Sequence, residues 1–375
     1  MKKRIVSIIL LLCMVFSLSS CKQAETLSTD TLTVEHETKF GGVYLHITIE
    51  DFCGLGFEYG DSVDIKLSNG FILEDIPFYN GYYTRAGEPL LCAYPGYPYV
   101  DACYNNGESL YLAAGLDEDC TAVVYLHESG KYLAIQQVMS MTYTNERGDY
   151  SSDEVFANFR PMSGGGLAEN LFYRAASPCD NQYQRAEYSS ALCAEAGIGY
   201  ILDLADAEEE LKTYHDYSGI EFPYWLELYE NGRVLALDMA ANYRDHEFAE
   251  RVARAMRAVI KEEGPFLIHC TEGKDRTGFV CLLVEALAGA SLDELRTDYM
   301  TTYDNYYGVT AESDPEGYKA VTELKFDDMV LYLCDADSTD GLTPDKLVAG
   351  AEKYLTFGGM TDDEIVLLKN TVTGK

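Results

Sequence analysis

Ten consecutive residues carry the groups that could do chemistry in this chain. They run from His269 to Gly278 and read HCTEGKDRTG. Cys270 supplies a sulfur nucleophile and Arg276 a guanidinium group, at the two ends of one short loop. A thiolate can attack phosphorus, and the planar fork of arginine can hold two phosphoryl oxygens at once, which lysine cannot do. The spacing therefore predicts phosphate chemistry at this loop.

The residues around the loop predict the elements that position it. Residues 264–268 form a short apolar run bounded by turn residues, which is typical of a buried strand, and residues 276–288 are apolar and compatible with a helix. The loop N–H groups would then converge at a helix N-terminus, which carries roughly half a positive charge. That field stabilises the thiolate form of Cys270, and Gly273 permits the tight curl.

The motif and its surroundings resemble the cysteine-based protein tyrosine phosphatases. The Lys-Asp pair before the arginine is similar to the bacterial group described as triple-specificity or phosphoinositide-active. The resemblance covers roughly residues 154–373 and implies an α/β fold with a central, mostly parallel sheet flanked by helices. Besides the loop, it rests on four passages in the expected order: residues 158–160 with 171–176, 197–204, 352–355 and 361–365.

This resemblance implies hydrolysis of phosphomonoesters through a phosphocysteine intermediate, without a cofactor. Cys270 would be the nucleophile, Arg276 would hold the phosphoryl group, Asp275 would be the general acid, and His269 would support the loop. Candidate substrates are phosphotyrosine or phosphoserine proteins and phosphoinositides, with inositol polyphosphates as an alternative. The expected phosphate-binding residues are Thr271, Glu272, Gly273, Lys274, Thr277 and Gly278.

Several alternatives remain open at this stage. Asp203, Asp206 and Asp238 compete with Asp275 for the role of acid, because each follows a predicted strand or precedes the nucleophile at a plausible spacing. Cys270 could instead be a buried core cysteine. A third possibility, from another class, is a surface glycan- or ligand-binding lipoprotein whose phosphatase domain is vestigial.

The N-terminus predicts export and a lipid anchor. Residues 1–4 are basic at three positions, residues 5–16 are apolar but too few to span a bilayer, and Leu18-Ser19-Ser20-Cys21 resembles a bacterial lipobox. Cleavage would leave Cys21 lipidated, so residues 1–21 would be a lipoprotein signal peptide and the mature chain would be extracytoplasmic at the cell membrane. A formal net charge of −34 makes nucleic acid an improbable partner.

The chain between the signal segment and the catalytic domain predicts two further parts. Residues 22–38 are polar and predict a flexible tether, and residues 39–145 alternate apolar and polar residues, which favours a small all-β domain, a barrel or a sandwich. Residues 150–375 alternate predicted helices and strands and would form the catalytic domain. Expected strands of the β-rich part include residues 43–49, 63–67, 71–73, 109–113, 122–126 and 132–135.

The remaining cysteines and histidines indicate neither a particular disulfide pairing nor a metal site. Once Cys13, Cys21 and Cys270 are set aside, eight of the eleven cysteines remain, which permits disulfides without indicating any pairing. No Cys-x2-Cys pair occurs and the six histidines are scattered, so no metal is expected. Four tyrosines within residues 299–307 could line a pocket rim or simply pack against the surface.

Overall fold

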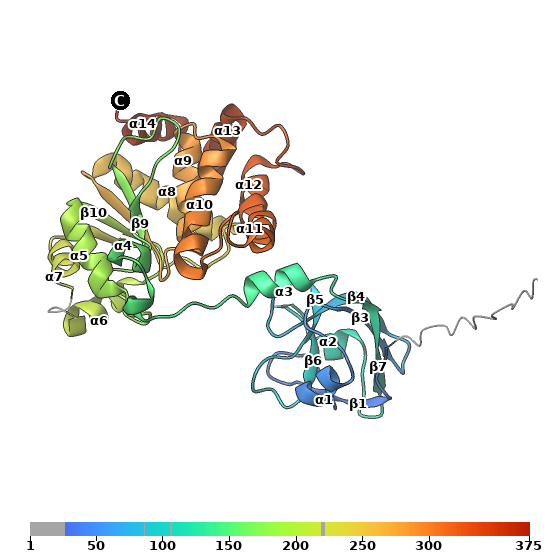
Figure 1. Cartoon of the computed structure of the whole chain (residues 1–375). Coiled ribbons are helices and arrows are strands. Elements are labelled where there is room, and N and C mark those ends of the chain that lie inside the picture. The colour runs from blue at the N-terminus through green and yellow to red at the C-terminus, as the bar shows by residue number, and fades with distance from the viewer. Residues whose placement is uncertain (1–26, 86, 106, 219–221) are drawn as a thin grey trace, which may run out of the picture. The chain divides into compact units, whose positions relative to one another are not determined.

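The computed structural model describes residues 27–375 except residues 86, 106 and 219–221. The chain forms two compact units that divide between Gln136 and Gln137 (Figure 1). The signal segment with Cys21, and residues 22–26 of the expected tether, lie outside the described residues. Within the described part of the chain, no helix is both long and apolar enough to cross a membrane.

The first unit is a closed barrel of seven strands in the order β1-β2-β6-β5-β4-β3-β7, so the expected β-rich part is a barrel and not a sandwich. Neighbouring strands are antiparallel except β4 and β5, which are parallel. Closure leaves no open sheet edge. The strands are β1 (Leu32–His36), β2 (Val43–Leu45), β3 (Ser62–Leu67), β4 (Ile72–Tyr79), β5 (Pro89–Cys92), β6 (Val100–Tyr104) and β7 (Thr121–Glu128), with helix α1 (Ile49–Gly54).

Three expectations for this part of the chain need correction. Leu32–His36, assigned to the tether, is strand β1 and pairs with both β2 and β7; only one face of it is inside the barrel, so the single buried Val34 suffices. Residues 109–113 form helix α2 (Leu110–Ala113), because the Ser109 side chain caps its N-terminus. Residues 132–135 belong to helix α3 (Leu133–Met139). Short apolar runs do not distinguish a strand from a helical turn.

The second unit contains a five-stranded sheet in the order β11-β10-β12-β9-β8. Only the edge strand β8 is antiparallel to its neighbour, so the sheet is mostly parallel, as the sequence predicts. Side chains alternate between the two faces: Phe266 and Ile268 belong to one apolar cluster and Leu267 to the other. The strands are β8 (Arg160–Pro161), β9 (Phe172–Ala175), β10 (Tyr200–Asp203), β11 (Val234–Ala236) and β12 (Phe266–His269).

Helices cover both faces of this sheet (Figure 1). One face packs against α5 (Ala186–Ala196), α6 (Glu208–Ser218) and α7 (Pro223–Glu230). The larger cluster on the other face contains α8 (His246–Lys261), α9 (Asp275–Leu287), α10 (Leu292–Tyr307), α12 (Asp327–Cys334), α13 (Pro344–Phe357) and α14 (Asp362–Val372). Short elements complete the unit: α4 (Asp153–Phe156), a 3-10 turn at Arg147–Asp149, α11 (Pro315–Val321) and a π-helical turn at Thr322–Phe326.

Local sequence explains several of these elements. The Ser291 and Glu294 side chains form a capping box at the start of α10. Helix α9 is buried from Thr277 to Leu287, which fits its mostly apolar sequence. All nine cysteines in the described residues are free thiols, so none of the permitted disulfides is formed there.

Candidate active site

The loop from Cys270 to Lys274 lies at the carboxyl end of the sheet. It leaves β12 at His269, whose register neighbours are Asp203 on β10 and Ala175 on β9, and it enters α9 at Asp275. This edge of a parallel sheet is where α/β folds usually bind ligands. The strand-loop-helix arrangement predicted from the sequence is therefore present.

Three successive carbonyl groups of the loop are held from outside. The Thr271 carbonyl accepts from the Ser177 backbone N–H at 3.2 Å, and the Glu272 carbonyl accepts from the Tyr306 hydroxyl at 2.6 Å. The Gly273 carbonyl accepts from Asn158 Nδ2 at 3.1 Å and from the Arg174 guanidinium at 3.0 Å. Three successive peptide groups are thus fixed in orientation.

The positions of these carbonyl groups also determine where the backbone N–H groups of the loop point. The C=O and N–H of a trans peptide point in opposite directions, so the N–H groups of Glu272, Gly273 and Lys274 face the inside of the loop. These three groups donate no hydrogen bond to the described residues. Gly273 has a φ of +67°, and a Cβ there would lie 2.2 Å from the Ala175 carbonyl oxygen. Only glycine fits this curl, and the result is a cradle of free N–H donors.

A buried ionic network holds the outer donors in place. Arg174 is fully buried and forms an ion pair with Asp298, which also pairs with Arg160 Nε at 2.9 Å. Burial alone would raise the pKa of Asp298, but the two arginines outweigh it and hold the pKa below its ordinary value. The sequence resemblance includes Asn158, Arg160 and Arg174 but gives them no role. An arginine inside an apolar strand signals a buried ion pair, because an unpaired buried charge is very costly.

The two principal residues of the motif meet at this loop. Cys270 is 3% exposed, at the point where the strand ends. The Arg276 side chain folds back across the loop and donates to Thr271 Oγ1 at 3.1 Å and to the Met239 carbonyl at 3.0 Å. Thr277 is fully buried, and its hydroxyl hydrogen-bonds none of the described residues. Gly278 allows close packing, since a Cβ would lie 2.7 Å from the Tyr299 ring.

Lys274 belongs to a polar and aromatic cluster beside the loop. Its Nζ lies 3.4 Å from Glu272 Oε1 and 3.1 Å from the Tyr307 hydroxyl, and Glu272 also accepts from the Tyr143 hydroxyl. Burial would lower the pKa of Lys274, but Asp275 and Glu272 outweigh it and raise the pKa, so the ammonium stays charged. The Tyr143 and Tyr306 rings stack at 4.8 Å. Tyr306 and Tyr307 of α10 thus hydrogen-bond residues of the loop, a role that the sequence does not predict.

The four candidate acids occupy different environments. Asp203 and Asp206 are 0% and 6% exposed, behind the loop. The Asp238 side chain is 63% exposed and lies 3.3 Å from Arg251. The Asp275 side chain is 51% exposed, begins α9 and lines the same cavity as Arg276. Of the four, Asp275 combines solvent access with a position in the cavity wall beside Arg276.

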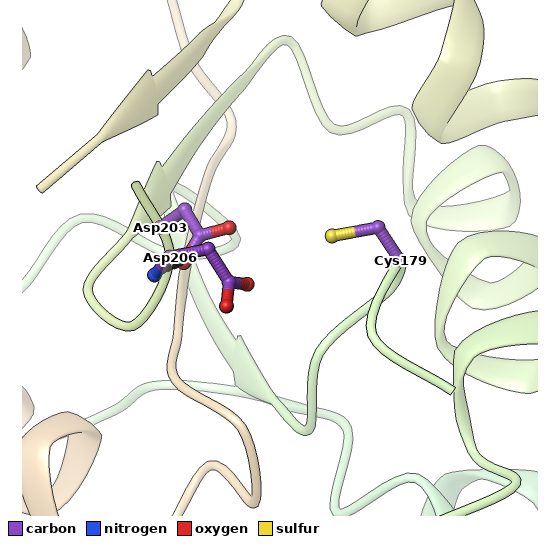
Figure 2. Close-up of side chains that lie close together, drawn as sticks. All are labelled: Cys179, Asp203 and Asp206. Atoms are coloured by element: carbon purple, nitrogen blue, oxygen red, sulfur yellow. Dashed lines mark hydrogen bonds between the residues drawn. The ribbon is translucent and has the colours of Figure 1, made fainter. Parts of the chain in front are cut away.

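Three potential metal ligands lie together behind the loop. One ligand atom from each of Cys179, Asp203 and Asp206 lies within 4.8 Å of the other two, and Figure 2 shows the Cys179 sulfur pointing toward the two carboxyl groups. Burial raises the pKa of Asp203 to about 6, and burial together with Asp203 raises that of Asp206 to about 8. Asp206 therefore favours its protonated form at neutral pH, which reduces the repulsion between the two carboxyl groups.

His269 supports the loop from the same side. Its ring is fully buried, with Nδ1 3.4 Å from the Cys270 carbonyl oxygen and Nε2 3.6 Å from Asp203 Oδ2. Burial lowers the pKa of His269 to about 4. The imidazole is therefore neutral at physiological pH, which suits a structural role.

The chain belongs to the tyrosine phosphatase family, and it is a phosphatase. A profile of that family matches residues 156–373, more than half of the chain and the whole of the site. A comparison with curated proteins found no match.

Solved structures also resemble the chain. One is the core catalytic domain of the PP-IP phosphatase SIW14 from S. cerevisiae in complex with citrate, at 18% sequence identity and a TM-score of 0.26. The match covers 45% of this chain and 91% of that one.

Replacing Tyr306 by phenylalanine tests the outer support of the loop. Tyr306→Phe removes one hydrogen bond to the Glu272 carbonyl and keeps the ring. Since one hydrogen bond contributes about 0.5–1.5 kcal/mol, we expect kcat/KM for p-nitrophenyl phosphate to fall by up to roughly tenfold. The matched control is Tyr224→Phe on α7, which loses a 2.8 Å bond to the Ile198 carbonyl. An equal loss of activity in both variants would contradict the proposed support.

Replacing Asp206 by asparagine tests the buried carboxyl pair. In the unfolded chain an aspartate ionises near pH 3.9, whereas burial raises the pKa of folded Asp206 to about 8. Between these values the folded state retains a proton that the unfolded state releases, so stability falls as pH rises. Asp206→Asn removes this dependence. We expect the difference in melting temperature, variant minus wild type, to increase from pH 5 to pH 8. A difference that stays constant over this range would show that Asp206 is ionised when buried.

Proposed function

We propose that this phosphatase hydrolyses phosphomonoesters through a phosphocysteine formed on Cys270, with substrates among phosphotyrosine or phosphoserine proteins and phosphoinositides. The observation that carries the proposal is the set of three loop carbonyls held outward, which leaves the N–H groups of Glu272, Gly273 and Lys274 free to bind an anion. Inward N–H donors beside a buried sulfur and a folded-back arginine form a phosphoryl site.

The first step transfers the phosphoryl group to sulfur. The Cys270 thiolate attacks phosphorus, the S–P bond forms and the bond to the leaving oxygen breaks. Arg276 and the loop N–H groups hold the non-bridging oxygens as charge develops on them. Asp275 gives its proton to the leaving oxygen, so an alcohol or phenol departs.

The second step returns the enzyme to its starting state. Water attacks the phosphocysteine, and the Asp275 carboxylate left by the first step takes a proton from that water. The S–P bond breaks, inorganic phosphate leaves and the thiolate is restored. Asp275 thus acts as acid and then as base at one position.

A series of phosphate esters tests both roles at once. Wild type should hydrolyse p-nitrophenyl phosphate and phenyl phosphate, whereas Cys270→Ser should fall to background on both. Asp275→Asn should lose far more on phenyl phosphate, because phenolate is a poorer leaving group and depends on protonation; general acids contribute about 10²–10⁴-fold. Rates of phosphate release measure each effect.

Asp238→Asn is the matched control for this series. Since Asp238 is exposed and paired with Arg251, we expect its variant to keep the wild-type dependence on the leaving group. If Asp238→Asn shows the stronger dependence, the acid is Asp238. If wild type is inert on every ester, the chain is a binding lipoprotein with a vestigial phosphatase domain.

We also propose that the enzyme is exported and anchored to the cell membrane by lipid on Cys21. Support comes from the basic, apolar and lipobox segments within residues 1–21. In a bacterial host, metabolic labelling with palmitate should mark the wild-type chain and not Cys21→Ala, which should move from the membrane to the soluble fraction. Labelling of Cys21→Ala at the wild-type level would refute this site.

A further inference from the structure

A cavity of about 320 Å³ adjoins the proposed site on the side of α9. Asp275 and Arg276 form part of its wall, and the rings of Tyr243, Phe279 and Tyr299 form another part. Lys325 lines the same cavity from the π-helical turn Thr322–Phe326. The space beside the arginine therefore has an apolar floor and a second cation.

The position of Lys325 depends on an unusual backbone. Helices α11 and α12 are continuous through the π-helical turn, which carries one more residue than an α-helical turn. Such turns are rare and occur frequently at functional sites. The turn carries Leu324 and Lys325, both of which line the cavity.

Lys325 is a half-buried cation without a partner among the described residues. Burial lowers its pKa, and the attraction of Asp275 and Asp328 only partly offsets that effect. Other cations nearby are already paired: Lys274 with Glu272, and Arg244 with Asp328 at 2.7 Å. A half-buried ammonium that forms no ion pair is costly, so an anion in the cavity would be stabilised.

The two carboxylates that line the cavity are compensated by cations other than Lys325. The Asp328 carboxylate accepts from Arg244 and from the Tyr243 hydroxyl. The Asp275 carboxylate lies 3.9 Å from Lys274 Nζ. With Arg276 occupied by the phosphoryl group being transferred, Lys325 remains for a different anionic group.

We propose that Lys325 binds a second phosphate of the substrate, so the cavity beside Arg276 is a specificity subsite for small, multiply phosphorylated alcohols. This inference rests on the proposed function of the adjacent loop. The shared chemistry is a second phosphate close to the one removed. That phosphate can belong to a free inositol phosphate or to a lipid headgroup, and the experiment below separates the two sources.

The test compares Lys325→Met with wild type on two soluble substrates, inositol hexakisphosphate and p-nitrophenyl phosphate. The ratio of interest is kcat/KM for inositol hexakisphosphate divided by kcat/KM for p-nitrophenyl phosphate. Because Lys325→Met loses a charge-assisted bond to phosphate, we expect this ratio to fall about tenfold or more, mainly through a higher KM for the inositol phosphate. Lys325→Arg should restore most of the ratio. The matched control is Lys319→Met on α11, an exposed lysine paired with Glu323 outside the cavity.

A third substrate identifies the source of the phosphate. Phosphatidylinositol bisphosphate in phosphatidylcholine vesicles is assayed with the same variants. Each kcat/KM value is again divided by that for p-nitrophenyl phosphate. If Lys325→Met lowers the ratio only for the vesicles, the subsite binds a lipid headgroup. If it lowers the ratio only for inositol hexakisphosphate, the subsite binds the free compound. Either outcome supports the subsite, as does a fall with both.

Two outcomes would overturn the inference. One is a Lys325→Met variant with unchanged ratios for both multiply phosphorylated substrates and a wild-type melting temperature. The other is an equal loss on all three substrates, which would assign Lys325 a purely structural role. Hydrolysis of p-nitrophenyl phosphate by wild type reports separately on the proposed function, so failure of the subsite and failure of the enzyme are distinguishable.

Discussion

The outward attachment of the loop carbonyls is the constraint on which the site depends. The carbonyl groups of Thr271, Glu272 and Gly273 each accept a hydrogen bond from a donor outside the loop. Their peptide planes can then present only N–H groups to the inside of the loop. Without those donors, a short loop of this kind would satisfy its own polar groups or bind water. The buried polar contacts of the fold therefore orient the peptide groups of the loop, and the resulting site is preorganised for an anion.

The donors themselves require much of the second unit. Arg174 comes from β9, Asn158 from the segment before β8 and Tyr306 from α10, so three separate elements converge on two carbonyl groups. Arg174 can be buried only because Asp298 of the same α10 neutralises it. The close approach of Gly273 to Ala175 then fixes the loop against the sheet. Helix α10 thus supports the loop through both an ion pair and a hydroxyl group.

The sequence alone predicts the loop, the strand before it and the helix after it, because these depend on local spacing and apolar pattern. It also predicts the mostly parallel sheet. It does not predict β1, since a strand with a single buried residue such as Val34 has the composition of a tether. Nor does it predict that Tyr306 contacts Glu272 or that Lys325 lies on a π-helical turn, because both depend on tertiary packing between distant segments.

The strong negative charge of the chain makes the local arrangement of cations decisive. A net charge of −34 repels phosphate at long range, but screening at physiological salt confines that repulsion to about 8 Å. Inside the site, Arg276 and the loop N–H groups act at contact distance in a partly desolvated environment, where attraction is stronger. Glu272 compensates Lys274, so that lysine adds little net charge, whereas Lys325 forms no ion pair with the described residues. A substrate with one phosphate interacts only with the loop. In the proposed subsite, a second phosphate would also interact with Lys325 across the cavity. This additional interaction would allow an acidic protein to select polyanions.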